Sequence, residues 1–117
     1  MSIYAIDHIQ IAIPPRAEDC ARGFYIAMLG FTEVPKPPAL ADRGGLWLIQ
    51  GDVALHLGVE QAFQPARKAH PGFLVDNLDA WLRGVKQLAT DPPPTNRHWT
   101  AIAAPMFLIR LVIGLSC

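Results

Sequence analysis

The chain has 117 residues, of which 51% are hydrophobic and 17% are charged. A chain of this length and hydrophobicity can bury a core and fold as one domain without disulfides or a structural metal. Ten Lys and Arg residues balance ten Asp and Glu residues, and this formal net charge of zero argues against nucleic acid or an anionic membrane as a partner.

The termini and the cysteines predict a cytoplasmic protein. The apolar residues near the N-terminus alternate with polar ones and follow no basic segment, unlike a secretion signal. Cys20 and Cys117 lie far apart and in no metal-binding spacing, which fits a reducing compartment. The apolar residues 101–115 fall short of the roughly 20 that a spanning helix needs and include Arg110, so we expect no membrane anchor.

The first element along the chain is a strand over residues 6–13, IDHIQIAI, because apolar and other residues alternate there. Its core-facing residues are Ile9, Ile11 and Ile13, and His8 and Gln10 share the other face. Residues 16–31 then predict an amphipathic helix that ends at Gly30 and packs on the isoleucine face. The apolar residues of this helix recur every four positions and are Cys20, Phe24 and Met28.

Two runs rich in β-forming residues follow, at 45–50 and 52–59, and predict a hairpin that turns at Gly51. In the second run the apolar face consists of Val53, Leu55, Leu57 and Val59. His56 therefore lies on the opposite face. Residues 70–75, HPGFLV, predict another short strand, in which His70 lies opposite Phe73 and Val75.

A second helix is predicted to begin near residue 77, with Asp76 or Asn77 as its N-cap. Its inward-facing residues are predicted to be Leu78, Leu82 and Val85. The segments HIQIAI and HPGFLV, each followed by a helix, look like two copies of one unit. His8 then corresponds to His70, so two related sheets can supply ligands to one shared metal.

Several segments in order resemble the vicinal oxygen chelate superfamily, which includes glyoxalase I, fosfomycin-resistance and bleomycin-resistance proteins and extradiol dioxygenases. They are DHIQIAI, FYIAMLGF, RGGLWL, ALHLGVE and HPGFLVDNLDA, and the resemblance covers about residues 5–85. The resemblance implies an α+β fold in which two βαβββ modules form a cupped mixed sheet. The single domain 1–117 would contain module 1 at about 1–62 and module 2 at about 66–117, with 86–117 atypical.

The resemblance also implies a divalent metal between the modules. His8 matches the first-strand ligand, His70 matches its counterpart in the second module, and His56 lies near the fourth-strand ligand. The last-strand Glu of the superfamily has no counterpart, so Zn, Ni, Mn or Fe would bind more weakly. The expected substrate contacts are Gln10, Arg43 and Trp47, and no catalytic residue is assigned.

The C-terminal segment suggests a change of reading frame near Val85 or Lys86. One permitted set of codons for residues 106–117, read in the shifted frame, encodes YVSDPFGNRFEL, which contains the missing DPFGN motif and the glutamate. We therefore hypothesise that one base was lost and that residues 86–117 are out of frame. The coding DNA decides the question.

Three functions stay open on the sequence. The first is a divalent-metal-dependent lyase, isomerase or dioxygenase, or an impaired remnant of one, that acts on a small oxygen-chelating substrate. The second is a metal-free protein that binds a small planar molecule, as the bleomycin-resistance members do. The third is an inactive domain without a ligand. Superfamily members commonly pair across subunits, so we expect a homodimer.

Overall fold

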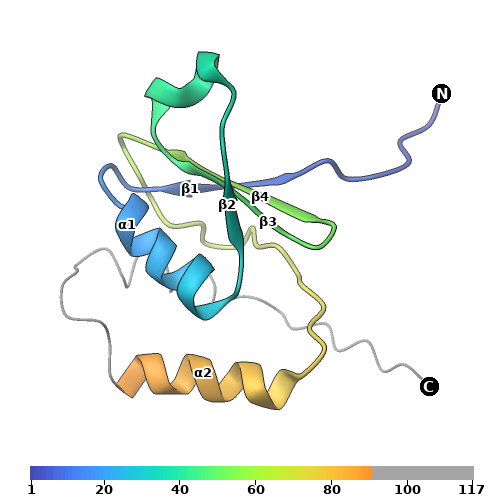
Figure 1. The fold of residues 1–117 in the computed structure, drawn as a ribbon, viewed down its shortest axis with the longest axis vertical. Coiled ribbons are helices and arrows are strands. Elements are labelled where there is room, and N and C mark those ends of the chain that lie inside the picture. Colours follow the sequence, from blue (N-terminus) through green and yellow to red (C-terminus); the bar gives the residue numbers. More distant parts are fainter. Residues whose placement is uncertain (91–117) are drawn as a thin grey trace. The chain divides into compact units, whose positions relative to one another are not determined.

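The computed structural model describes residues 1–90, and the chain forms two compact units, Met1–Pro65 and Ala66–Cys117. The first unit contains four strands and three helical segments in chain order (Figure 1). They are β1 (Ile9–Ile13), α1 (Glu18–Ala21), η1 (Arg22–Met28), β2 (Thr32–Val34), η2 (Pro38–Arg43), β3 (Leu46–Gln50) and β4 (Val53–Val59). This order of strand, helix and three strands is the predicted βαβββ module.

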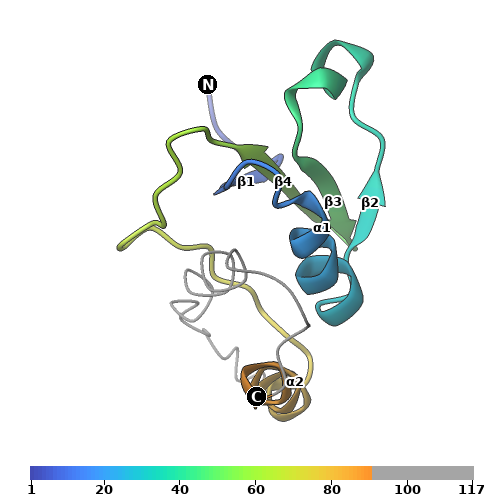
Figure 2. The same cartoon turned by 90° about the vertical axis from the view of Figure 1, so that its left-hand side faces the viewer.

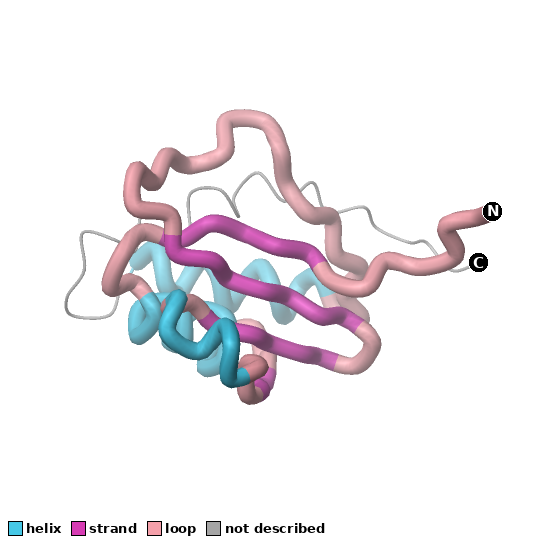
Figure 3. Tube along the Cα trace, turned by 90° about the horizontal axis from the view of Figure 1, so that it is seen from above, coloured by secondary structure: helices cyan, strands magenta, loops and turns pink. Residues whose placement is uncertain are grey.

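The four strands form one open mixed sheet in the order β1-β4-β3-β2 (Figure 3). β1 runs parallel to β4, whereas β3 is antiparallel to both β4 and β2. The hairpin between β3 and β4 turns at Gly51, as predicted, with a φ of 56° at that glycine. The α+β fold and the mixed sheet predicted from the sequence are therefore confirmed.

The core of the first unit lies between the sheet and the helical segment α1–η1, which runs along one sheet face (Figure 2). The sheet contributes alternate residues, which are Ile13, Leu46, Leu48, Leu55 and Leu57. The helical side and its flanks contribute Ala17, Ala21, Phe24, Tyr25 and Phe31. Burial of apolar area at these positions is the main force that holds helix and sheet together.

The first helix differs from the prediction in its winding. After one α-helical turn the chain continues as a π-helix, and the N–H of Leu29 donates to the carbonyl of Phe24, five residues back. The wider turn rotates later residues around the axis. Tyr25 is fully buried, and Phe24 of the predicted apolar face is buried as well, whereas Met28 at the end of the π-helix is only half-buried. Cys20, which precedes the π-helix, is also half-buried. Gly30 ends the helix with a φ of 80°, as predicted.

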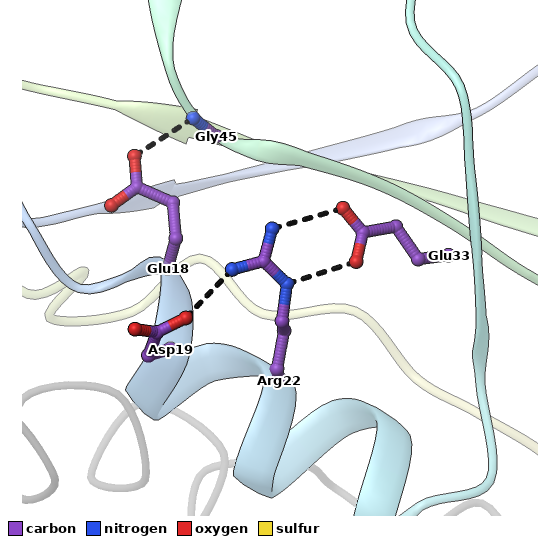
Figure 4. Close-up of polar contacts among 5 residues, drawn as sticks. All are labelled: Glu18, Asp19, Arg22, Glu33 and Gly45. Atoms are coloured by element: carbon purple, nitrogen blue, oxygen red, sulfur yellow. Dashed lines mark hydrogen bonds and ion pairs between the residues drawn. The ribbon is translucent and has the colours of Figure 1, made fainter.

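Polar contacts fasten the helix to the sheet (Figure 4). A carboxylate oxygen of Glu18 accepts a hydrogen bond from the N–H of Gly45 at 3.1 Å. The guanidinium of Arg22 donates to Glu33 on β2 at 2.9 and 3.1 Å and to Asp19 at 2.8 Å. The ion pairs of Arg22 are accessible to solvent, so they fix orientation more than they add stability.

In the second unit the described residues form one helix, α2 (Leu78–Thr90). The side-chain oxygen of Asn77 accepts a hydrogen bond from the N–H of Ala80 at 2.9 Å, so Asn77 is the N-cap of the two predicted candidates. Leu78 and Trp81 are half-buried, whereas Leu82, which was predicted to face inward, is exposed. The side chain of Val85 is not among those that the structure describes.

The predicted strand at residues 70–75 is not formed in the described part of the chain. Phe73 and Val75 are still less exposed than Leu74, so the predicted alternation of faces is present without a strand. A strand needs a partner for its backbone hydrogen bonds, and no described segment pairs with residues 70–75. The shifted-frame segment lies mostly outside the described residues, and that hypothesis stays a prediction.

Candidate functional site

The sheet face away from the helix carries polar and aromatic side chains from β1, β4 and β3. In the register of the sheet, Gln10 lies beside His56, and His56 lies beside Trp47. His8 precedes β1 on the same side as Gln10, because alternate residues of an extended chain share a face. We call this surface the polar sheet face; its members are His8, Gln10, Trp47, His56 and Gly58.

Three rings on this face form a continuous stack. The ring centroids of Trp47 and His56 are 4.0 Å apart with an interplanar angle of 3°. Those of His56 and His8 are also 4.0 Å apart, at 18°. Trp47 and His56 are half-buried and His8 is exposed, so the outer end of the stack is open to solvent.

His8 is held by its neighbour in the chain. Its Nδ1 lies 2.7 Å from a carboxylate oxygen of Asp7, whose side chain is almost fully exposed. The contact leaves Nε2 of His8 for another partner. Sequence reasoning missed Asp7, because adjacent residues of a regular strand point to opposite faces; here β1 begins only at Ile9, after this pair.

His56 has a depressed basicity. Burial lowers the pKa of His56 below its ordinary value of 6.5, the proximity of His8 lowers it further, and Asp7 acts weakly in the other direction. The ring is therefore neutral at neutral pH. A neutral imidazole has a free nitrogen lone pair, which is the form that binds a metal.

Gln10 extends over Gly58 on the neighbouring strand. A Cβ on Gly58 would lie 2.6 Å from Nε2 of Gln10, so the absence of a side chain makes room for the amide. Gln10 is exposed and adjoins the ring stack in the register. Gln10, which we expect to contact the ligand, therefore lies next to His8 and His56, the two histidines of this unit.

The remaining predicted site residues, Arg43 and His70, belong to other elements of the chain. Arg43 is exposed at the end of η2. His70 belongs to the second unit, is exposed, and has its Nδ1 2.8 Å from the carbonyl oxygen of Lys68. The convergence of His70 with His8 and His56 therefore stays a prediction.

The donor set suits a metal in kind, although it is not complete in the described residues. Within residues 1–90 no three His, Cys, Asp or Glu side chains come together closely enough to hold a metal ion. His8 and His56 provide two neighbouring imidazoles, but their rings are stacked. Because the nitrogen lone pair of an imidazole lies in the plane of the ring, two stacked rings do not point their lone pairs at one common ion. Binding one ion would require one ring to turn, and the exposed His8 has the room to do so.

Comparison with solved structures decides the family. A glyoxalase family protein from Bacillus anthracis is 42% identical, with a TM-score of 0.71 over 76% of this chain and 73% of the other. The chain belongs to the glyoxalase family of the vicinal oxygen chelate superfamily. No family model and no curated protein matches it. The resemblance inferred from the sequence is therefore confirmed.

Two more distant structures share the glyoxalase fold. The fosfomycin resistance protein FosX from Listeria monocytogenes, in complex with Mn(II) and dihydroxypropylphosphonic acid, has a TM-score of 0.57 at 13% identity over 75% of this chain and 67% of its own. A bleomycin resistance determinant encoded on the transposon Tn5 has a TM-score of 0.50 at 22% identity, over 79% and 72%. At these identities the likeness concerns the fold alone. Among residues 1–90 no helix is long and apolar enough to cross a membrane.

Proposed function

We propose that this glyoxalase family protein binds a divalent metal ion through His8 and His56, with His70 as the third ligand, and uses it to hold a small molecule with neighbouring oxygen atoms. The observation that carries the proposal is the pair of imidazoles 4.0 Å apart on the polar sheet face. The depressed pKa of His56 supports it, since no proton has to be displaced from that ring at neutral pH.

Each residue of the proposed site would have its own role. His8, His56 and His70 would hold Zn, Ni, Mn or Fe, and the ion when bound would neutralise negative charge on substrate oxygens. Gln10 can hydrogen-bond a substrate group through its amide, and Trp47 offers an apolar ring surface to the rest of the molecule. Arg43, on η2, is proposed to attract an anionic group of the substrate.

The sequence has no counterpart of the superfamily's last-strand glutamate, and this narrows the possible reaction types. Isomerisation of the glyoxalase kind needs a base beside the metal, and no described acidic side chain joins the two imidazoles in a metal-binding cluster. We therefore propose ligand binding by the metal as the primary activity, with lyase, isomerase or dioxygenase turnover weaker than in relatives that have the last-strand glutamate. We further propose that the protein is cytoplasmic and forms a homodimer. Solution scattering of the purified protein would test the oligomeric state.

The test is metal content per chain, measured by elemental analysis after separate incubation with Ni, Zn, Mn and Fe. About one ion per chain is expected for at least one metal. His8→Ala, His56→Ala and His70→Ala should each weaken binding by about tenfold or more, on the scale known for groups that merely support a ligand. His98→Ala is the matched control, because His98 has no assigned role. A chain without metal under all four conditions overturns the proposal.

The ring stack favours a second candidate function, which is metal-free binding of a planar molecule. Trp47 and His56 stack with their rings parallel to within 3°, and His8 is exposed at the outer end of the stack, where a further aromatic ring can stack. Titration with planar aromatic compounds, followed by calorimetry in the presence of a chelator, separates the two functions. Binding that survives the chelator and is lost in Trp47→Ala supports this second function.

A further inference from the structure

The hydrogen bond between Asp7 and His8 fixes which nitrogen of the His8 ring carries the proton. A carboxylate oxygen only accepts hydrogen bonds when it is ionised. Nδ1 of His8, 2.7 Å from Asp7 Oδ2, must therefore be the donor. In the neutral ring Nε2 then has the lone pair. The sequence DH thus sets the tautomer of a residue at the open end of the ring stack.

The second unit repeats the arrangement with a different acceptor. Nδ1 of His70 lies 2.8 Å from the backbone carbonyl of Lys68, and a carbonyl oxygen also only accepts. Nε2 of His70 again has the lone pair. His8 and His70 occupy corresponding positions in the two copies of the repeated segment, so the two copies reach the same tautomer by independent contacts.

This coincidence is informative because the neutral side chain of free histidine in water prefers the opposite tautomer, with the proton on Nε2. Each ring is held in the less common form by an oxygen one or two residues earlier in the chain. Where a histidine binds a metal, its other nitrogen usually donates to a carboxylate or a carbonyl, which orients the ring and makes the ligand nitrogen more basic. Both contacts have that form.

We propose that Asp7 is a positioning residue, which holds His8 in the Nδ1–H tautomer and leaves the Nε2 lone pair for a ligand, and that the Lys68 carbonyl holds His70 in the same tautomer. The tautomer assignment concerns the metal-free chain. Its consequence for affinity rests on the metal-binding function proposed above. The side chain of Asp7 is 94% exposed, so its effect should be moderate.

The decisive experiment is ¹⁵N NMR of the histidine rings in the metal-free full chain, well above the ordinary histidine pKa of about 6.5. Wild-type His8 and His70 should both show the Nδ1–H tautomer. Asp7→Ala should move His8 toward the Nε2–H tautomer and leave His70 unchanged, which provides an internal control. Asp7→Asn keeps an acceptor oxygen, so it should restore much of the wild-type pattern. Asp52→Ala, at an exposed turn, is the matched control.

Metal titration of the same variants gives the second measurement. Asp7→Ala should raise the dissociation constant by about tenfold, the low end of the effects of such supporting groups, and Asp7→Asn should raise it less. If the His8 tautomer is the same in wild type and Asp7→Ala, the inference is overturned, whatever the metal affinity. If the tautomer changes but no variant binds metal, the tautomer assignment stands and the proposed function is overturned.

Discussion

The two units of the chain differ in how their sequence patterns became structure. In the first unit, alternating residues over β1, β3 and β4 are paired into a sheet and buried under a helix. In the second, the segment at residues 70–75 has the same alternation but forms no strand, while the capped helix α2 forms as predicted. A helix closes its hydrogen bonds locally, whereas a strand depends on a partner elsewhere in the chain.

The largest expected effect comes from a chain in which the proposed frame change is reversed. Replacing the residues after Val85 by the sequence of the shifted frame should supply strand partners, so residues 73–75 should gain strong protection from hydrogen exchange. Amide exchange of the two chains, compared residue by residue, measures this. Coding DNA that does not spell the motif in the shifted frame would end the hypothesis before the protein is made.

A buried and an exposed leucine test how far the energetics of the two units differ. Leu55 is fully buried on β4, and Leu55→Ala should lower the free energy of unfolding by about 3 kcal/mol through lost burial and a cavity. Leu74 is 73% exposed, and Leu74→Ala should change it by less than about 0.5 kcal/mol. Urea denaturation of the full chain measures both. Equal losses of unfolding free energy in Leu55→Ala and Leu74→Ala would contradict the difference in burial between the two leucines.

Two glycines in the first unit separate backbone strain from collision. Gly45 has a φ of 80°, and a Cβ there would collide with the carbonyl oxygen of Leu57. Gly51 has a φ of 56° with nothing within 4 Å of the added atom. Gly51→Ala should therefore cost about 1 kcal/mol and Gly45→Ala more than about 2 kcal/mol. Thermal and urea unfolding rank the two variants, and the reverse order would refute this packing at the start of β3.

The smallest effect concerns pH. A hydrogen bond from Arg22 holds the pKa of Glu33 below 4.5, so the folded state favours the carboxylate. The stabilisation is complete above the unfolded pKa and is lost as the pH falls through the folded one. Because both side chains are exposed, Glu33→Gln should cost at most about 0.5 kcal/mol at neutral pH. As the pH is lowered, the urea midpoint of Glu33→Gln should converge with that of the wild type. The control is Glu60→Gln, which replaces an exposed glutamate and should have the wild-type midpoint at each pH.

The sequence predicted what local patterns determine. The isoleucine alternation of β1, the turn at Gly51 and the cap at Asn77 each depend on a few neighbouring residues, and all three are present. The predicted burial of Met28 is incomplete, because the π-helical winding of residues 22–28 has no plain signature in the pattern.

The site was predictable in its members more than in its geometry. Alternation placed His8, Gln10 and His56 on one face, and the sheet brings Gln10 and His56 side by side. The stacking of Trp47 on His56 depends on the strand register, which the sequence did not specify. Asp7 was missed because adjacent residues of a strand point to opposite faces, whereas Asp7 and His8 precede β1 and their side chains are in contact.

The position of Trp47 against His56 gives the molecule a built-in optical reporter. A protonated imidazole in face-to-face contact quenches indole emission, whereas a neutral one does so weakly. Because burial depresses the pKa of His56, the emission of Trp47 should report the charge of that one ring at pH values more acidic than those at which a free histidine titrates. Once the other two tryptophans, Trp81 and Trp99, are replaced by phenylalanine, the emission of Trp47 can thus follow events on the polar sheet face without any attached label.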